Sequence, residues 1–320
     1  MEFNAIFGHD HQKQILSSLV QKEKLPHALL FAGPRGVGKR TTAFELARNL
    51  FCEEKRACGT CRSCRNLAAA IHPDFRLLPG ETSIKIDELR AIRKEVYEPP
   101  YEAPVRVILI DNAELMTREA ANALLKTLEE PPPSNLFILV TSREQEIPAT
   151  VRSRCMRIGF GPLSRDTIRS YFENVLNQDR SKAELFSGIS NGSIAAGIFW
   201  MNEGNFQTRQ RIAEVLTGKR RGFTSATMIA ERITKEGNEF EYLSFLLSFF
   251  RDIWWAGYAG DASGLLNSDL REIIEKNGRG RLGWAEVSIK RVLETIRTLR
   301  YNVNRWLVME SLLLNIMRSA

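Results

Sequence analysis

The sequence lacks the features of an exported or membrane-spanning protein. Its first ten residues are polar and contain no apolar stretch of the kind that forms the centre of a secretory signal peptide. The most apolar segment, residues 242–260, is interrupted by Arg251 and Asp252, which favours a buried helix over a membrane span. Low-complexity regions and internal repeats are also absent from the sequence. We therefore expect a cytoplasmic protein without a membrane partner.

The composition indicates a globular protein with a modest excess of positive charge. The chain has 320 residues, of which 43% are hydrophobic and 26% charged, enough for two or three domains and a large core. Its formal net charge is +7 and its pI is near 9.2. This excess permits a polyanionic partner such as DNA, but it is spread along the chain, and a solvated surface explains most of it.

Cysteine is scarce, yet four of the five cysteines stand close together. Without a secretion signal we do not expect disulfides. Four thiolates at this spacing are typical of a tetrahedral structural Zn²⁺ site, which leaves no position open for a catalytic water; free thiols and an iron–sulfur cluster are the alternatives. Two excess negative charges would be offset by Lys55, Arg56, Arg62 and Arg65. The predicted zinc module spans residues 52–64, and its ligands are Cys52, Cys58, Cys61 and Cys64.

Residues 33–40 match a phosphate-binding loop except at one position. In the pattern G-x-x-x-x-G-K-[ST], the last position supplies a hydroxyl that holds Mg²⁺, and here it is Arg40. Thr41 cannot simply replace that hydroxyl, because one further helical residue turns a side chain by about 100°. The sequence therefore predicts a cradle for a nucleotide, leaves the binding of ATP open and disfavours hydrolysis. The residues of the predicted loop are Gly33, Gly36, Gly38, Lys39, Arg40 and Thr41.

The loop has the flanks that the pattern requires. The apolar run 28–32 predicts a buried strand, and 41–50 predicts a helix with an apolar face. In that context the glycines let backbone N–H groups surround phosphate oxygens, and the helix N-terminus adds its dipole. The sequence thus predicts an α/β P-loop domain with a parallel sheet. Its other expected elements are strands at 71–78 (entered through the turn His72-Pro-Asp74), 84–86, 105–111 and 136–140, a helix at 88–96 capped by Asp87, and a helix at 117–130.

Polar residues follow two of these strands where an ATPase would place its catalytic groups. Asp111 ends a strand, and in P-loop proteins this acid binds Mg²⁺ through water. The next residue, where a catalytic glutamate often stands, is Asn112, whose amide cannot take a proton from water. We assign no role to the nearby Glu114. Thr141 follows the strand 136–140 and is a candidate phosphate sensor, with a turn or cap as the alternative.

Arg152 and Arg154 lie in a short predicted helix or turn at 148–155. Surface salt bridges are the simplest interpretation of such arginines. The alternative is an arginine finger, a planar cation that reaches the nucleotide of a neighbouring subunit. After residue 162 the expected strands stop and the pattern is helical, with runs at 240–258, 284–299 and 304–317. We expect their aromatic residues, Trp254, Trp255 and Trp306, in the core.

From Phe3 to about Leu163 the chain resembles the AAA+ clamp-loader proteins of bacterial replication. The resemblance implies that Arg154 is a trans arginine finger, that the cysteines hold zinc, and that residues 163–205 form a helical lid and 206–320 a collar that joins subunits into a ring. Residues 1–162 would be the AAA+ P-loop domain. The matching segments are Leu25-Pro-His-Ala28, the four-cysteine insert, Ile110-Asp-Asn-Ala-Glu-Leu-Met116, Ala121-Asn-Ala-Leu-Leu-Lys-Thr-Leu-Glu-Glu-Pro-Pro132 and Ser153-Arg-Cys155.

Three departures favour the non-motor delta-prime branch of this family over its gamma/tau motor branch. Arg40 replaces the hydroxyl, Asn112 replaces the catalytic carboxylate, and Ala195 stands where motor subunits carry a sensor arginine. The segments His72-Pro-Asp74 and 302–314 are also more similar to that branch.

The resemblance implies an accessory subunit of DNA polymerase III that hydrolyses little or no ATP itself. Its expected partners are gamma/tau and delta subunits, the sliding clamp, and primed DNA through the complex. Two alternatives remain open at this point. One is an active clamp-loader or repair AAA+ ATPase, and the other is a zinc-dependent DNA-binding module.

Overall fold

In the computed structural model the chain forms two units, and each is described by itself. The first comprises residues 1–168 with 192–194, and the second comprises 169–191 with 195–320. No helix within the described ranges is long and apolar enough to cross a bilayer. The structure describes residues 1–80, 83–218, 222–260, 264–301 and 303–319.

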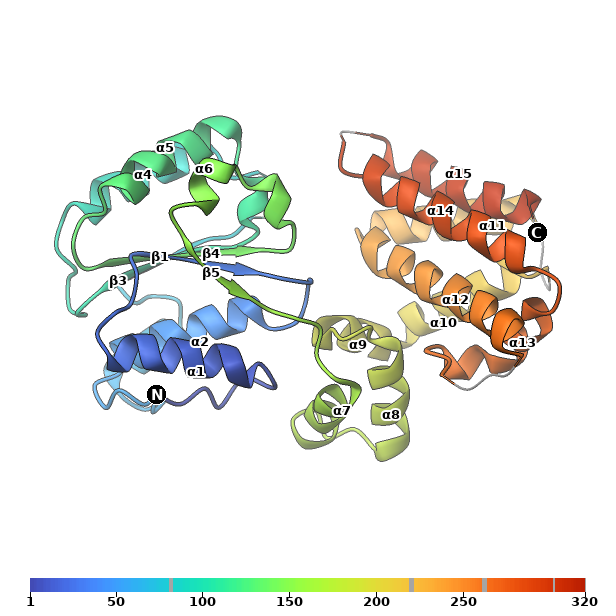
Figure 1. Cartoon of the computed structure of the whole chain (residues 1–320), viewed down its shortest axis with the longest axis horizontal. Helices are drawn as coiled ribbons and strands as arrows, with labels where there is room; N and C mark the ends of the chain where they lie inside the picture. Colours follow the sequence, from blue (N-terminus) through green and yellow to red (C-terminus); the bar gives the residue numbers. More distant parts are fainter. Residues whose placement is uncertain (81–82, 219–221, 261–263, 302, 320) are drawn as a thin grey trace. The chain divides into compact units, whose positions relative to one another are not determined.

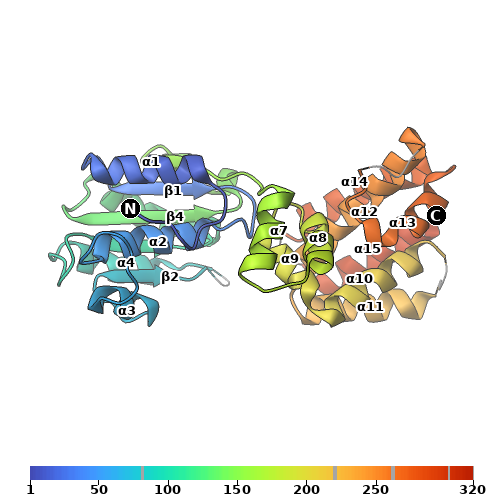
Figure 2. The ribbon, with the colours of Figure 1, turned by 90° about the horizontal axis from the view of Figure 1, so that it is seen from below.

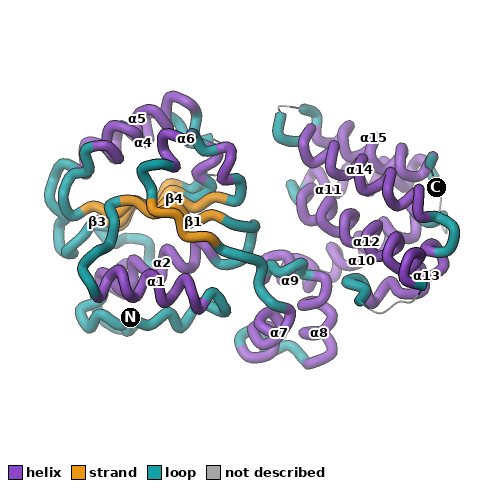
Figure 3. The backbone as a smooth tube through the Cα atoms, in the orientation of Figure 1, coloured by secondary structure: helices purple, strands orange, loops and turns teal. Residues whose placement is uncertain are grey.

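A parallel β-sheet is the centre of the first unit (Figures 1 and 3). Its order is β2-β3-β4-β1-β5, so the strand that leads into the P-loop lies between β4 and β5. Every residue of β1, β3 and β4 is buried, as expected of apolar strands covered on both faces. Within the described residues the sheet consists of β1 (Ala28–Ala32), β2 (Phe75–Leu78), β3 (Arg106–Ile110), β4 (Asn135–Thr141) and β5 (Met156–Gly159).

Helices cover both faces of the sheet and form two hydrophobic layers (Figures 1 and 2). Leu16, Leu46 and Leu67 lie in the layer under one face, and Leu89 and Leu124 lie in the layer over the other. The predicted α/β P-loop fold is thereby confirmed. The first face carries α1 (Asp10–Gln21), α2 (Lys39–Phe51) and α3 (Arg62–Ala68), and the second carries α4 (Ile86–Val96), α5 (Arg118–Glu129) and α6 (Ala149–Arg152).

Three local predictions in this unit were incomplete or wrong. The expected strand at 84–86 is a single bridge between Ile84 and Met116, and α4 already begins at Ile86. Asp87 therefore lies inside the first helical turn, and Lys85 is the N-cap. The structure also contains α1 and β5, which the sequence analysis did not predict. Thr117 does cap α5, since its hydroxyl oxygen accepts a hydrogen bond from the amide of Ala120 at 3.2 Å.

Helices make up the second unit, and the boundary between the units falls within α7. Helix α12 packs along α13 and α14, while α11 packs against α15. The predicted three-part division at residues 163 and 206 stays a prediction, because the two-unit division does not separate a lid. Asn302, the first residue of the segment 302–314, lies outside the described residues. The helices are α7 (Arg165–Asn174), α8 (Arg180–Ile189), α9 (Ile194–Met201), α10 (Glu203–Leu216), α11 (Phe223–Lys235), α12 (Glu239–Ala259), α13 (Arg271–Gly278), α14 (Leu282–Thr298) and α15 (Arg305–Arg318).

The core of this unit differs from the one that the sequence predicted. Trp254, Trp255 and Trp306 are only half-buried, and the fully buried rings belong to Tyr242, Phe249 and Phe250 among others. For Trp254 and Trp255 the prediction was wrong because the long apolar helix α12 presents rings on all sides, and only part of its circumference is covered. Trp306 lies on α15, whose buried residues are Met309, Leu312, Leu313 and Ile316.

An ion pair between a buried arginine and a partly exposed aspartate lies beside these rings. Arg209 is fully buried, and its guanidinium donates to the carboxylate of Asp269 at 2.5 Å and to the side-chain oxygen of Asn267 at 2.6 Å. It also stands over the ring of Phe245, 4.7 Å from the ring centre.

Candidate functional site

The predicted phosphate-binding loop connects β1 to α2. Gly36 and Gly38 have φ angles of 73° and 102°, in the left-handed region that favours glycine. At Gly33 the need for glycine is steric, because a Cβ atom there would lie 2.1 Å from the carbonyl oxygen of Phe160. The loop therefore favours glycine at the two positions that the pattern specifies, Gly33 and Gly38, and also at Gly36.

Lys39 is buried and bonded to the loop itself. Its ammonium donates to the carbonyl oxygens of Gly33 at 2.8 Å and Pro34 at 2.5 Å. Burial lowers the pKa of Lys39 to about 8, against the opposing effect of Glu114 and Asp111. The lysine thus stands inside the cradle where the pattern places it.

Arg40 forms an ion pair with Asp111 across the site. The guanidinium Nη1 lies 3.1 Å from the Oδ2 atom of Asp111, while Oδ1 accepts the backbone amide of Asn112 at 3.0 Å. The carboxylate is nearly buried, with 12% of the side chain exposed, and the arginine is 49% exposed. Arg40, which departs from the ATPase pattern, and Asp111, which matches it, are thereby in direct contact.

Asn112 uses its side chain within the fold. It adopts a left-handed conformation with φ 47°, and its amide nitrogen donates to the carbonyl oxygen of Gly80 at 2.9 Å. The amide of Gly80 in turn donates to the carbonyl oxygen of Asp111 at 3.1 Å. The residue at the position of the catalytic base therefore ties two loops together.

A buried carboxylate that sequence reasoning left without a role lies close by. Glu114, in the short 3₁₀ helix η1 (Ala113–Leu115), accepts a hydrogen bond from the hydroxyl of Ser142 at 2.7 Å and lies 3.5 Å from the guanidinium of Arg143. Burial raises its pKa, but hydrogen bonds from its own amide, Ser142 and Thr141 outweigh burial and lower it. Glu114 is therefore held as an internal anion.

Thr141 is fully buried at the end of β4, and its hydroxyl oxygen accepts the amide of Arg143 at 3.0 Å. Its predicted role as a phosphate sensor stays a prediction. Thr41 is exposed on the first turn of α2, and the neighbouring Thr42 is buried with its hydroxyl donating to the carbonyl oxygen of Gly38 at 2.9 Å.

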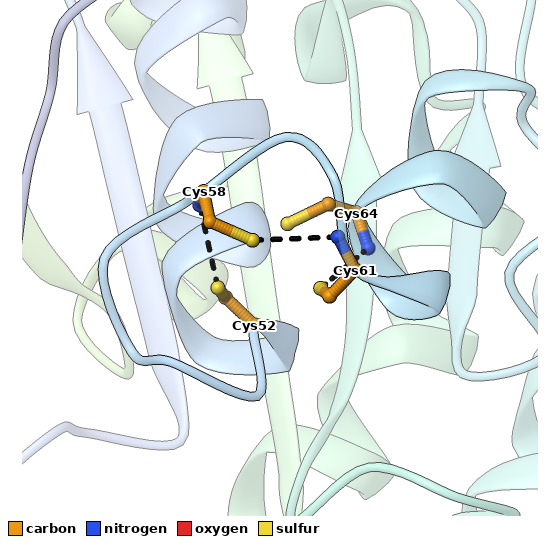
Figure 4. A group of neighbouring side chains, drawn as sticks. All are labelled: Cys52, Cys58, Cys61 and Cys64. Carbon is orange, nitrogen blue, oxygen red and sulfur yellow. Dashed lines mark hydrogen bonds between the residues drawn. The ribbon is translucent and has the colours of Figure 1, made fainter.

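The four clustered cysteines converge on one point between α2 and α3 (Figure 4). Their sulfur atoms all lie within 4.8 Å of one another. A tetrahedral Zn²⁺ with bonds of about 2.3 Å would separate its sulfur ligands by about 3.8 Å, so the four thiols can hold a metal ion after a small contraction.

The local backbone supports anionic sulfur at this point. Amides of Cys58, Cys61 and Cys64 donate to the sulfur of the preceding cysteine in the cluster, each at 3.4 Å. Burial raises the pKa of Cys64 to about 12, so a cation is needed before all four can be thiolates at neutral pH.

A cation that interacts with Cys64 was not among those that the sequence predicted. Arg48 of α2 interacts with its sulfur and pairs with Glu45 at 3.1 Å. Among the predicted cations, Arg56 is bound to Glu54.

Arg154 lies at the surface, after α6 and before β5. Its guanidinium donates to Glu129 at 2.7 Å and to the carbonyl oxygen of Thr150 at 2.9 Å. The side chain of Arg154 is 34% exposed and that of Glu129 is 49% exposed. Glu129 ends helix α5, within the segment Leu128-Glu-Glu-Pro-Pro132, so two motifs that are separate in the sequence meet at this ion pair.

Comparisons with known proteins agree with these features. Residues 8–164 match the family described as DNA polymerase III, delta subunit. The chain is 30% identical to DNA polymerase III subunit delta' of Bacillus subtilis over 312 residues, which are 94% of each chain. It is 28% identical to the delta' subunit of Pseudomonas aeruginosa over 322 residues, 94% of this chain and 95% of that one.

A similarity to a gamma subunit covers only part of the length. The DNA polymerase III subunit gamma of Buchnera aphidicola is 34% identical over 200 residues, which are 60% of this chain and 55% of that protein. The chain thus spans about half the length of this relative, whereas the delta' subunits match along nearly their whole length. The predicted resemblance is confirmed, and the chain belongs to the delta-prime family of DNA polymerase III clamp-loader subunits.

Proposed function

We propose that this chain is the non-motor subunit of a bacterial clamp loader and that it donates Arg154 to ATP bound by an adjacent gamma/tau subunit. ATP binding there would tighten a ring that also contains a delta subunit, and the ring would open a sliding clamp and place it on primed DNA. The observation that carries the proposal is a contrast within one unit. In the chain's own nucleotide site, Arg40 stands in place of the Mg²⁺-binding hydroxyl and pairs with Asp111, whereas Arg154 lies outside that site in an ion pair with Glu129 whose two side chains are 34% and 49% exposed.

The chain's own site is poorly equipped for hydrolysis. Asn112 cannot accept a proton, and the loss of an acid–base group removes about 10²–10⁴ in rate. Arg40 takes the place of the hydroxyl that would hold Mg²⁺, and it pairs with the acid that would complete the metal site. These effects need not add, but the loss of the acid–base group alone turns a turnover each second into one in about two minutes or longer.

The contacts of Arg154 are weak enough for its guanidinium to exchange Glu129 for the triphosphate of a neighbouring subunit. An exposed ion pair contributes about 0–1 kcal/mol, so the bond to Glu129 offers little resistance to a triphosphate with several negative charges. An arginine finger supplies about 10³–10⁵ in rate in the enzymes that use one. Glu129 would hold the guanidinium in a defined place until a neighbour arrives.

The cysteine cluster would hold a structural Zn²⁺. Cys52, Cys58, Cys61 and Cys64 supply four sulfur ligands, which leave no position for a substrate. The metal would fix the loop between α2 and α3. The helices after residue 162 would provide the lid (163–205) and the collar (206–320).

The test uses a loader reconstituted from this chain and its motor and delta partners. We compare the wild-type chain with Arg154→Ala, with Arg154→Lys, and with Arg157→Ala as a matched control, because Arg157 is a neighbouring exposed arginine that pairs with Glu144 at 2.8 Å. Both Arg154 variants should assemble normally but lower the clamp- and DNA-stimulated ATPase rate by at least about tenfold. The control should stay within about twofold of wild type.

Lysine is included because it keeps the charge but loses the planar fork. An unchanged ATPase rate and unchanged clamp loading with Arg154→Ala would refute the role. Steady ATP turnover by the lone chain, abolished by Lys39→Ala, would instead establish the active-ATPase alternative. Tight, salt-sensitive DNA binding by the lone chain that is lost when zinc is removed would establish the DNA-binding module.

A further inference from the structure

Arg40 occupies the place of a metal ion in the nucleotide loop. In P-loop proteins, the hydroxyl at this position and an acid at the end of a later strand hold Mg²⁺ from two sides. Here the guanidinium of Arg40 replaces the hydroxyl and lies 3.1 Å from Oδ2 of Asp111. Oδ1 of the same carboxylate accepts the backbone amide of Asn112 at 3.0 Å. Both oxygens of the acid are therefore engaged by groups of the chain itself.

The surrounding residues do not restore a magnesium site. Mg²⁺ requires near-octahedral oxygen ligands at about 2.0–2.1 Å. The hydroxyl of Thr42, in the first turn of α2, is buried and donates to the carbonyl oxygen of Gly38 at 2.9 Å. The side chain of Asn112 is bonded to Gly80. A guanidinium at hydrogen-bond distance from Asp111 also places a positive charge where the ion would lie, so the residues present do not fit Mg²⁺.

The same loop keeps the groups that bind phosphate. Gly36 and Gly38 retain the left-handed conformations that turn backbone amides into the cradle, and Lys39 points into it. The side chain of Arg40 is about half exposed, and only one of its nitrogen atoms is bonded to Asp111. Since a guanidinium has five N–H donors, the others are available to a ligand.

We propose that this loop binds the phosphates of a nucleoside di- or triphosphate without magnesium, with the guanidinium of Arg40 in place of the metal ion. Arg40 would screen the phosphates from the negative charge of Asp111, which is what Mg²⁺ does in an active site. The bound nucleotide would be a structural ligand. This site is separate from Arg154, so the inference does not depend on the trans arginine finger.

The test is calorimetric titration of the full chain, isolated and zinc-loaded, with ATP and with ADP. Each titration is run in magnesium-free buffer and again with millimolar MgCl₂. No chelator is used, because it would also attack the cysteine cluster. Arg40→Thr restores the hydroxyl of the pattern, and Arg40→Ala removes the cation without supplying a ligand. Circular dichroism and zinc content confirm that each variant is folded.

The wild-type chain should bind the nucleotide in magnesium-free buffer, and MgCl₂ should strengthen binding by less than about threefold. In Arg40→Thr, MgCl₂ should strengthen binding by at least about tenfold, which is about 1.4 kcal/mol, because the metal then has both ligands. Arg40→Ala should bind at least about tenfold more weakly than wild type without magnesium.

Three results overturn the inference. The first is that MgCl₂ strengthens nucleotide binding by the wild-type chain more than about threefold. The second is that MgCl₂ strengthens nucleotide binding equally in wild type and Arg40→Thr. The third is that the folded wild-type chain fails to bind millimolar nucleotide without the metal. None of them bears on the Arg154 experiment, which is read from the ATPase of the assembled loader.

Discussion

Asp74 stabilises the first unit through contacts whose contribution can be measured directly. Its carboxylate is fully buried and accepts the backbone amides of Tyr101 at 2.6 Å, Glu102 at 2.8 Å and Ala103 at 2.9 Å. It also lies 3.9 Å from the guanidinium of Arg106. The substitution Asp74→Asn keeps the size of the side chain but removes the charge and one acceptor oxygen.

The expected loss follows from these contacts. A hydrogen bond to a charged group contributes about 1.5–3 kcal/mol. An asparagine whose oxygen takes the place of Oδ2 loses the bond from Tyr101 and keeps those from Glu102 and Ala103 only as weaker bonds to a neutral acceptor. The NH₂ group of the asparagine then faces the amide of Tyr101, which needs an acceptor. We expect the free energy of unfolding of the first unit to fall by about 3–5 kcal/mol. The matched control is Asp87→Asn on α4, whose carboxylate is 83% exposed and should change stability by less than about 0.5 kcal/mol.

Hydrogen–deuterium exchange of the segment 101–103 is the assay, because these amides have Asp74 as their acceptor. Their exchange should accelerate by at least about 100-fold in Asp74→Asn, which corresponds to about 2.7 kcal/mol. Tryptophan fluorescence is an internal control, since all five tryptophans lie in the second unit, at positions 200, 254, 255, 284 and 306. Its urea transition should not move. Exchange and stability equal to those of Asp87→Asn would refute the reasoning.

The effect also has a defined pH dependence. Burial alone would raise the pKa of Asp74, but the three backbone hydrogen bonds and Arg106 outweigh it and hold the pKa below its ordinary value of 3.8. A group whose pKa is lower in the folded state contributes stability that is fully present above the unfolded pKa and is lost as the pH falls through the folded pKa. The difference between wild type and Asp74→Asn should therefore be constant near neutral pH and shrink below about pH 4.

Three further predictions concern other parts of the chain. Elemental analysis should find one zinc per chain, and Cys61→Ser or chelation should remove it and lower the melting temperature of the first unit by circular dichroism, whereas Cys155→Ser should retain it. Gly33→Ala should destabilise that unit by about 1–3 kcal/mol in urea unfolding, because its Cβ would lie 2.1 Å from the carbonyl oxygen of Phe160; an unchanged midpoint would contradict the packing. Arg209→Met should lower the stability of the second unit by about 3–5 kcal/mol, followed by tryptophan fluorescence, because it leaves the carboxylate of Asp269 without its buried partner.

The central strands were predictable because each contains a continuous run of apolar residues. Residues 28–32, 107–110 and 136–140 are apolar on both faces, as strands in the middle of a covered parallel sheet must be. Strand β5 has only four residues and lies at an edge, where Met156 and Arg157 are exposed, so it has no such run. Helix α1 was missed for a similar reason, since it buries Leu16 alone.

The residue identities of the site were predictable, but their contacts were not. A pattern of glycines and a lysine defines a loop, because only those residues meet its conformational and charge requirements. The ion pair between Arg40 and Asp111 joins residues that are 71 positions apart, and no local pattern encodes it. The same holds for Arg48 beside Cys64 and for Asn112 on Gly80, which depend on how α2 and β3 lie in the sheet.

In the proposed mechanism, the guanidinium of Arg154 acts on a neighbouring subunit while the chain's own nucleotide loop hydrolyses no ATP. The most direct measurement compares Arg154→Ala with Lys39→Ala in the same reconstituted loader, with ATP turnover followed in the presence of clamp and primed DNA. We predict that Arg154→Ala lowers turnover by at least about tenfold and that Lys39→Ala leaves it within about twofold of wild type. The reverse pattern, with turnover lost in Lys39→Ala and kept in Arg154→Ala, would contradict the account.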